Sequence, residues 1–257
     1  MACCFLFAGA RSAVPPPDLP AAIFTDPVVD TAHPQNLDLA QVLRRAGWTV
    51  ITFHYTGSWG SGGQFTLRGG IDDALALLAY LRVPTHAKSW DVDPERILLL
   101  GHSYGGYVAA RTAVESPGVI GVVMLAPWDI SFDSRKWSAL PLAGRNQAAA
   151  TTFDDVDGRL AGATDLSLLE EMMRYGSTLD LAKLAAPLAS RSVLLITASR
   201  DDDDDKAADF ITGMQCSGAT HFTTQLMDTD HSFNSHRVAL QASILRWLAV
   251  LPGAPHQ

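Results

Sequence analysis

The feature that most constrains this chain is an apolar run that breaks into a glycine-rich turn between Arg96 and Gly106. Residues Ile97–Leu100 predict a buried strand, and the turn Gly-His-Ser-Tyr-Gly at 101–105 leads into alanine-rich sequence that predicts a helix. Gly-x-Ser-x-Gly between a strand and a helix is the pattern of a nucleophile elbow, a strained turn that holds a serine hydroxyl above the sheet edge, at the positive end of the helix. We therefore expect Ser103 to be a nucleophile.

Length, charge and cysteine content exclude several kinds of protein. A chain of 257 residues can bury one sizeable core. Its formal charge of −8, from 19 basic and 27 acidic residues, argues against a nucleic-acid partner. No apolar run reaches about 18 residues, so no membrane association is expected. Cys3, Cys4 and Cys216 form no disulfide framework and suit a reducing, cytoplasmic location. No histidine or cysteine spacing indicates a metal site.

The expected organisation is a single domain with short tails. Residues 1–20 read as a tail and proline-rich linker, 21–252 as the domain, and 253–257 as a C-terminal tail. The N-terminus weakly resembles a signal peptide, but it lacks a positive start. From about 128 to 190, short helical patterns replace strand signals and predict a helical insertion over the sheet edge. We expect this insertion to shape a pocket, with Trp128 and Trp137 contributing to it.

Strands alternate with helices along the rest of the chain, which predicts an α/β fold with a mostly parallel sheet and helices on both faces. The expected strands lie at 21–24, 48–55, 97–100, 119–125, 192–198 and 220–227, and further helices lie at 36–46, 70–81, 206–214 and 235–250. Residues 91–94 read as a turn into the elbow strand. The loop 56–63 is glycine-rich but lacks the spacing of a phosphate-binding loop, so we expect a flexible loop near the active site.

Candidates for a general base and its acidic partner follow the last two predicted strands. The strand 192–198 runs into Asp201, the first of five consecutive aspartates, and the last strand runs into His231. The carboxyl ends of parallel strands meet at one sheet edge, so both side chains should lie near Ser103. A serine hydroxyl needs a base to take its proton, and the base needs a third group to orient it. Of the eight histidines, His231 alone lies between the last strand and the last helix; the acid is Asp201 or, less favoured, Asp202.

These motifs resemble the α/β-hydrolase superfamily, and within it the serine peptidase–like branch related to prolyl oligopeptidase. The resemblance covers about residues 36–251. It is carried by Phe-His-Tyr-Thr-Gly-Ser-Trp-Gly-Ser at 53–61, Gly-His-Ser-Tyr-Gly-Gly at 101–106 and Asp-Thr-Asp-His-Ser-Phe at 228–233.

The resemblance implies a triad of Ser103, Asp201 and His231, with the backbone N–H of Tyr104 as one donor of an oxyanion hole. It also implies that no cofactor is needed. The implied activity is hydrolysis of carboxylic esters or amides through an acyl-enzyme, on a small-molecule or short peptide substrate. Nothing in the sequence indicates an oligomeric state.

Two departures from the family pattern keep other readings open. The predicted strand 21–24 is not followed by the usual His-Gly, whose loop supplies a second oxyanion donor, and the hairpin that normally precedes this strand is missing. The large gating domain of oligopeptidases is also missing. The favoured reading is an esterase-like serine hydrolase. The alternatives are a serine aminopeptidase or oligopeptidase, and a catalytically impaired binding protein on a hydrolase scaffold.

Overall fold

A six-stranded parallel sheet forms the centre of the described structure. The computed structural model describes residues 19–25, 35–154, 159–201 and 207–252, with only the backbone of 19–25 and 35–38. Its strands are β1 (Leu19–Thr25), β2 (Thr49–Thr52), β3 (Val92–His102), β4 (Val119–Leu125), β5 (Val193–Ala198) and β6 (Phe222–Met227). They lie in the order β2-β1-β3-β4-β5-β6, with each neighbouring pair parallel, which confirms the predicted sheet.

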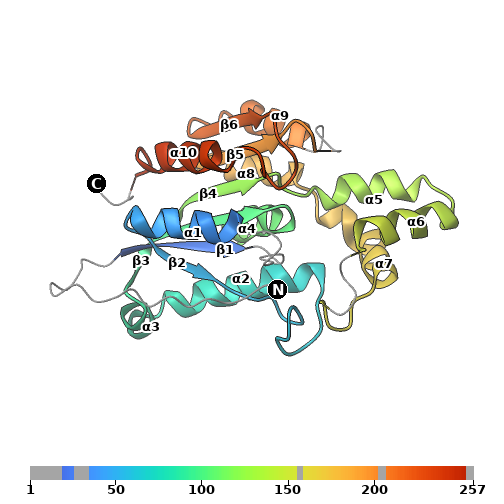
Figure 1. Ribbon diagram of the computed structural model, residues 1–257, viewed down its shortest axis with the longest axis horizontal. Helices are drawn as coiled ribbons and strands as arrows, with labels where there is room; N and C mark the ends of the chain where they lie inside the picture. The colour runs from blue at the N-terminus through green and yellow to red at the C-terminus, as the bar shows by residue number, and fades with distance from the viewer. Residues whose placement is uncertain (1–18, 26–34, 155–158, 202–206, 253–257) are drawn as a thin grey trace.

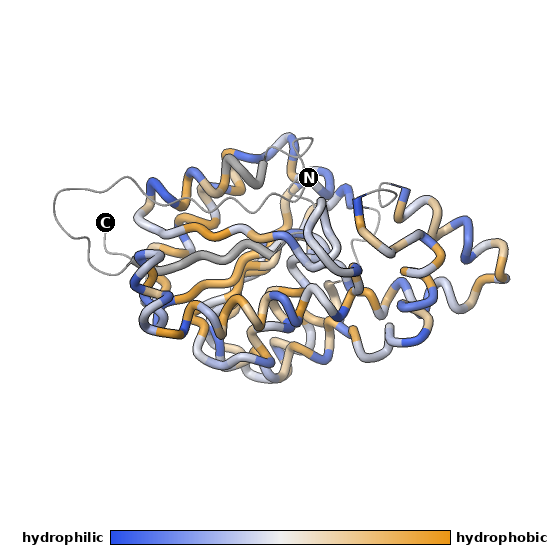
Figure 2. Tube along the Cα trace, turned by 90° about the horizontal axis from the view of Figure 1, so that it is seen from below, coloured by the Kyte–Doolittle hydropathy of each residue, from blue (hydrophilic) through white to orange (hydrophobic). Residues whose placement is uncertain are grey.

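Helices cover both faces of the sheet (Figure 1). They are α1 (Gln35–Arg45), α2 (Leu67–Leu81), α3 (Pro84–Ser89), α4 (Tyr104–Glu115), α9 (Ala208–Cys216) and α10 (Arg237–Leu248). Alternate residues of a strand point to opposite faces, so β3 contributes to two separate cores. Ile97 and Leu99 pack with α2 and α4, whereas Leu98 and Leu100 pack with α1 and α10. Figure 2 shows the apolar strands enclosed between these layers.

The segment between β4 and β5 forms a helical insertion that lies to one side of the sheet (Figure 1). It contains α5 (Ile130–Ser138), α6 (Leu142–Thr152), α7 (Asp165–Tyr175), the 3-10 turns η1 (Gly176–Thr178) and η2 (Ala182–Leu184), and α8 (Ala185–Leu188). The insertion begins at a buried cap. Asp129 accepts hydrogen bonds from the N–H groups of Ser131 and Phe132 at the start of α5. Burial raises the pKa of Asp129, because its carboxylate is removed from water.

The predicted turn at 91–94 is wrong for residues 92–94, which belong to β3, and the linker boundary at residue 20 is also corrected, because Leu19 and Pro20 belong to β1. The backbone of Leu19 pairs with Val92 and that of Pro20 with Asp93, before the register shifts so that Ala21 pairs with Ile97. Proline has no N–H to give to a ladder, so it is tolerated in a strand beside an irregularity of this kind. Helix α3, which begins with a proline at its first position, was not predicted from the sequence.

The loop after β2, which we expected to be flexible, is cross-linked by hydrogen bonds. The Thr56 backbone N–H and hydroxyl both donate to the Asp73 carboxylate, at 2.6 and 2.8 Å. The hydroxyls of Ser58 and Ser61 both donate to the carbonyl of Tyr55. These side chains therefore bond to the loop itself or to α2. The bonds fix the position of the loop at the sheet edge.

The strand order reverses between β1 and β3, since β2 lies on one side of β1 and the later strands lie on the other. In open parallel sheets, ligands bind outside the carboxyl ends of the strands at such a switch point. The turn after β3 carries Ser103. The topology therefore leads to this turn as the first place to look for a site.

Candidate active site

Ser103 lies in a strained turn between β3 and α4. Its φ of 56° and ψ of −124° are an unfavourable conformation for a residue with a side chain, costing about 1–3 kcal/mol. Two of its backbone hydrogen bonds reach the end of β4 and the residues after it: the Ser103 N–H donates to the Leu125 carbonyl at 2.9 Å, and its carbonyl accepts from the Trp128 N–H at 3.0 Å. The turn is thus tied to the end of β4. Ser103 itself is half-buried.

Gly106 permits the close contact between this turn and the segment after β4. A Cβ at Gly106 would lie 3.0 Å from the Pro127 side chain and 3.3 Å from the Gly101 carbonyl oxygen. The helix would have to move away from Pro127 to accommodate it. Packing around the elbow therefore favours glycine as the second residue of the Gly-Gly pair.

Tyr104 follows the nucleophile and has two roles in the geometry. It is the first residue of α4, so its backbone N–H has no acceptor within the helix and is available to a ligand at the helix N-terminus. Its buried phenol donates to the Leu67 carbonyl at 2.5 Å. Burial raises the pKa of this phenol, and the nearby Glu171 charge raises it further, so the hydroxyl stays a donor. A Cβ at Gly70 would collide with the same hydroxyl.

His231 and Asp201 lie together on two neighbouring loops at the carboxyl end of the sheet. His231 Nδ1 is 2.5 Å from Asp201 Oδ2. An ionised carboxylate only accepts hydrogen bonds, so the proton lies on Nδ1 and the lone pair of Nε2 is free to take a proton. The His231 side chain is 42% exposed and that of Asp201 25%, which leaves the pair accessible from solvent.

The loop that carries His231 is compact. Phe233 is 1% exposed and has a φ of 55°, and its N–H donates to the Asp230 carbonyl. The hydroxyls of Thr229 and Ser235 lie 3.0 Å apart in hydrogen-bonding contact. The Thr229 carbonyl accepts from the Arg200 N–H, which joins this loop to the one that carries the acid. Buried packing and cross-loop bonds therefore support the histidine.

His102, which directly precedes Ser103, contacts His231 and so links the two loops. The His102 ring lies against the His231 ring, with centroids 4.6 Å apart, and its Nε2 is 2.9 Å from the His231 carbonyl oxygen. Of the hydrogen bonds made by the described residues, none joins the Ser103 hydroxyl to the His231 ring. The structure thus brings Asp201 and His231 into contact and seats the loop of His231 beside the serine turn.

The alternative acid and other acidic and histidine residues near this sheet edge differ in their surroundings. Asp202 lies outside the described residues. Asp228 is 83% exposed and faces Arg200, and Asp230 accepts from the backbone and side chain of Asn234, as expected of turn residues. Burial raises the pKa of Asp230, but the bonds from Asn234, together with the Arg200 charge and Thr229, lower it overall. His54, at the end of β2, is half-buried, and burial lowers its pKa.

Trp128 connects the serine turn to the insertion. Its indole Nε1 donates to the Asp133 carboxylate at 2.6 Å, and its ring contacts those of Tyr104 and Phe153 edge-on. It is half-buried, so part of its ring is accessible. Trp137, by contrast, is 4% exposed and packs edge-on against Phe153. The expectation that both tryptophans line a pocket is corrected, because Trp137 belongs to the core of the insertion.

The insertion is attached to α2 by an acidic side chain that the sequence analysis missed. Glu171, on α7, accepts hydrogen bonds from the N–H groups of Leu67 and Arg68, at 3.0 and 3.3 Å. The Thr66 hydroxyl caps the next N–H, that of Gly69. The first three N–H groups of α2 are therefore satisfied, two of them by a residue about 100 positions away. No local pattern signals such a contact.

A second attachment joins the insertion to the loop after β2. The Trp59 N–H donates to the Arg159 carbonyl, the Ala161 N–H to the Gly57 carbonyl, and the Phe65 N–H to the Ala161 carbonyl. The Arg159 guanidinium also lies 5.3 Å from the centre of the Trp59 ring. The β2–α2 loop and the insertion thus form one connected structure above the sheet edge.

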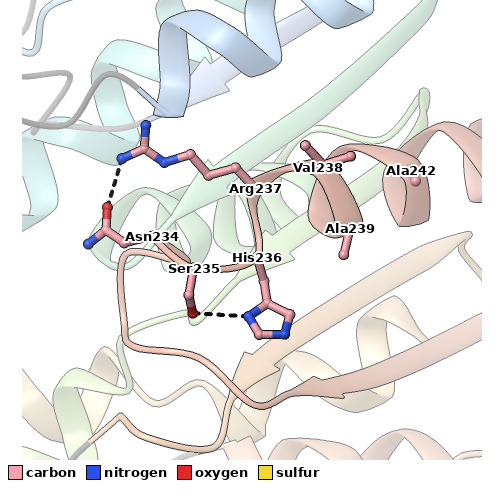
Figure 3. Close-up of a pocket in the computed structure, with 7 residues that line it drawn as sticks. All are labelled: Asn234, Ser235, His236, Arg237, Val238, Ala239 and Ala242. Carbon is pink, nitrogen blue, oxygen red and sulfur yellow. Dashed lines mark hydrogen bonds between the residues drawn. The ribbon is translucent and has the colours of Figure 1, made fainter.

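A cavity of about 520 Å³ lies at the start of α10, and Figure 3 shows the side chains that line it. The residues that line it are Asn234, Ser235, His236, Arg237, Val238, Ala239 and Ala242. Its polar side chains bond to one another: Arg237 donates to Asn234, and His236 Nδ1 lies 3.0 Å from the Ser235 hydroxyl. Neither Ser103 nor His231 lines it, so this cavity is distinct from the site at the serine turn.

Within the residues that the structure describes, no cluster of three or more histidine, cysteine or acidic side chains could hold a metal ion. The helices in this same part of the chain are too short or too polar to cross a membrane.

Comparison with known proteins identifies the family of this chain. A family model described as "Alpha/beta hydrolase family" matches residues 19–242. The chain belongs to the alpha/beta hydrolase family, which confirms the superfamily that the motifs resembled. The comparison does not address the prolyl oligopeptidase–related branch, which stays a prediction. No curated protein sequence matches the chain.

Solved structures with the same fold include two lipid- or ester-related enzymes. An esterase from Pyrococcus furiosus is 14% identical, with a TM-score of 0.62 over 90% of this chain and 82% of its own. A monoacylglycerol lipase from Paleococcus ferrophilus is 17% identical, with a TM-score of 0.58 over 88% and 93%. Mouse alpha/beta hydrolase domain-containing protein 10 is 17% identical, with a TM-score of 0.63 over 88% of each chain. At these identities the likeness establishes the fold.

Proposed function

We propose that this protein is a serine hydrolase that cleaves carboxylic esters through an acyl-enzyme. The observation that carries the proposal is the 2.5 Å contact between His231 and Asp201, at the sheet edge where Ser103 is held in its strained turn. The three residues come from turns after three different strands. This position favours a catalytic role over an ordinary surface ion pair, which would have no preference for a site next to a strained serine.

In the proposed first step, the Ser103 hydroxyl attacks the ester carbonyl carbon while His231 Nε2 takes its proton. Asp201 accepts from Nδ1, holds the imidazole in the required tautomer and stabilises the imidazolium that forms. The tetrahedral intermediate then collapses. The bond between the carbonyl carbon and the alcohol oxygen breaks, and the alcohol leaves with the proton from His231.

In the second step, His231 takes a proton from water, which attacks the acyl-serine. The ester bond to Ser103 breaks, the carboxylic acid leaves, and His231 returns the proton to the serine oxygen. No cofactor takes part in either half of this sequence. The residues of the chain supply the nucleophile, the base and the orienting acid.

The backbone N–H of Tyr104 is the proposed donor to the oxyanion. It lies at the N-terminus of α4, where the helix dipole also favours negative charge. A missing donor costs about 10²–10³ in rate, so the second donor is important. The usual source is the segment after β1, and residues 26–34 lie outside the described structure.

A fluorophosphonate probe tests the proposal, because it reacts with activated serines. We expect an adduct on the peptide that contains Ser103, no adduct in Ser103→Ala, and a strongly reduced adduct in His231→Ala. Circular dichroism of each variant controls for folding. Well-folded wild-type protein without an adduct contradicts the proposal and favours the binding-protein reading.

An ester and an amide of the same acyl group separate esterase from peptidase activity. Ester cleavage without amide cleavage supports the proposed function, to which the esterase and lipase among the structural neighbours lend support. Efficient cleavage of the amide would instead favour the peptidase reading.

A further inference from the structure

His102 is placed between the two residues whose separation controls the proposed reaction. It is the last residue of β3 and directly precedes Ser103. Its ring is half-buried and packs against the His231 ring at 4.6 Å and against Phe233 at 6.3 Å between centroids. Its Nε2 lies 2.9 Å from the His231 carbonyl oxygen.

The chemistry of this contact defines the tautomer of His102. A backbone carbonyl oxygen has lone pairs and no hydrogen, so it can only accept. A nitrogen held 2.9 Å from it must therefore carry the proton. His102 is thus an Nε2–H donor, the opposite tautomer to the Nδ1–H form that Asp201 imposes on His231.

The two histidines also differ in what holds them. His231 is held at its ring by Asp201, and its loop is held by Arg200 through Thr229. Both of those partners lie on the loop after β5. His102, in contrast, belongs to the strand that carries the serine, so its bond fixes the base relative to the nucleophile.

We propose that His102 is a positioning residue, which donates Nε2–H to the His231 carbonyl and packs on the His231 ring so that the base faces Ser103. The proposal rests on the proposed function for its effect on rate, but its tautomer and its contact with His231 are properties that can be measured without substrate. Misplacing a catalytic group by about 1 Å can cost 10²-fold in rate.

Two substitutions separate the hydrogen bond from simple packing. In His102→Gln, the amide nitrogen is four bonds from Cα, as Nε2 is in histidine, so it can donate to the same carbonyl. His102→Leu supplies a side chain of similar volume that can still pack on the His231 ring, but it removes the hydrogen-bond donor. A role in packing alone predicts that leucine is tolerated, whereas the proposed bond predicts that only glutamine is.

The first measurement is the rate constant for fluorophosphonate labelling of Ser103, with Tm recorded for each variant. We expect His102→Leu to label about 10–100-fold more slowly than wild type and His102→Gln to stay within about threefold. The proposal is overturned if folded His102→Leu labels at the wild-type rate, or if glutamine gives no rescue.

The second measurement is NMR of protein with ¹⁵N-labelled histidine, which does not depend on activity. We expect His102 to show the Nε2–H tautomer, and the Nδ1–H proton of His231 to shift or broaden in His102→Leu but not in His102→Gln. An Nδ1–H tautomer for His102 overturns the inference. If the NMR result is as expected but the wild type is not labelled, the proposed function fails and the positioning contact stands.

Discussion

The serine turn and the helical insertion above it are held by contacts of different range. Ser103 is fixed by the strand and helix on either side of it and by the neighbouring strand end, through Leu125 and Trp128. The insertion is held by bonds between segments about 100 residues apart, such as Glu171 to the start of α2. The serine turn is thus held by neighbouring parts of the sheet, whereas the insertion is held by side-chain and backbone contacts between segments that are distant in sequence.

The largest expected effect is on the rate of ester hydrolysis, when the residue that orients His231 is changed. Asp201→Asn should lower kcat/KM for an ester by about 10³–10⁴-fold, because the imidazole loses the partner that sets its tautomer. Tm should change little, since the carboxylate is partly exposed. Steady-state hydrolysis of an activated ester measures the effect, with Asp202→Asn as the matched control. A larger loss in the control would reassign the acid.

The next largest effect is expected at Tyr104, which follows Ser103 in the serine turn and whose hydroxyl bonds to the start of α2, where the insertion is attached. Tyr104→Phe removes the buried hydroxyl that donates to the Leu67 carbonyl, and the lost hydrogen bond should lower the free energy of unfolding by about 0.5–1.5 kcal/mol. We also expect slower turnover, since the backbone N–H of the same residue is the proposed oxyanion donor. Urea unfolding and ester hydrolysis measure the two effects. Tyr175→Phe, at an exposed site on α7, should change neither.

A smaller effect tests the attachment of the insertion. Glu171→Gln removes a negative charge from the N-terminus of α2, where it is worth about 0.3–1 kcal/mol. The loss should appear in urea unfolding, and KM should rise more than kcat falls if the insertion lines the pocket. Glu170→Gln, exposed on the same helix, is the control. Equal effects from both variants would mean that the contact with α2 does not anchor the insertion.

The smallest effect concerns an ion-pair cluster away from the serine. Hydrogen bonds from Arg68 and then Arg111 hold the pKa of Glu115 at about 2, below its usual 4.5. Because the folded-state pKa is the lower one, this carboxylate stabilises the fold above pH 4.5, and the contribution is lost as pH falls towards 2. Glu115→Gln should be less stable than wild type at neutral pH by at most about 1 kcal/mol, since the cluster is partly exposed.

Unfolding of both proteins between pH 2 and 7 measures this contribution. The difference between wild type and Glu115→Gln should shrink as pH falls below 4.5. A difference that does not change with pH would show that the ion pairs of Glu115 contribute nothing measurable. Turnover should be the same in both proteins at neutral pH, which sets this cluster apart from the serine turn.

The sequence predicted the sheet and the surroundings of Ser103 because the relevant signals are local. A strand, a Gly-x-Ser-x-Gly turn and a helix lie within one short stretch, and the rule that parallel strands share a carboxyl edge led to His231 and Asp201. The bulge where β1 meets β3 was not predictable, because a proline inside a strand reads as a turn. Glu171 and Trp137 could not be assigned, since an acidic or aromatic residue on a helix carries no mark of the distant surface it contacts.

The pairing of Gly57 and Phe65 with Ala161 has a practical consequence for engineering. The β2–α2 loop binds the segment between β4 and β5 through the backbone carbonyl of Gly57 and the backbone N–H of Phe65, which do not depend on side-chain identity. An insertion transplanted from another hydrolase would need, at the position of Ala161, a residue whose N–H and carbonyl both face the β2–α2 loop, and a carboxylate that reaches the start of α2. With those two features, we expect a transplanted insertion to dock on this loop while the turns that carry Ser103, Asp201 and His231 stay as they are.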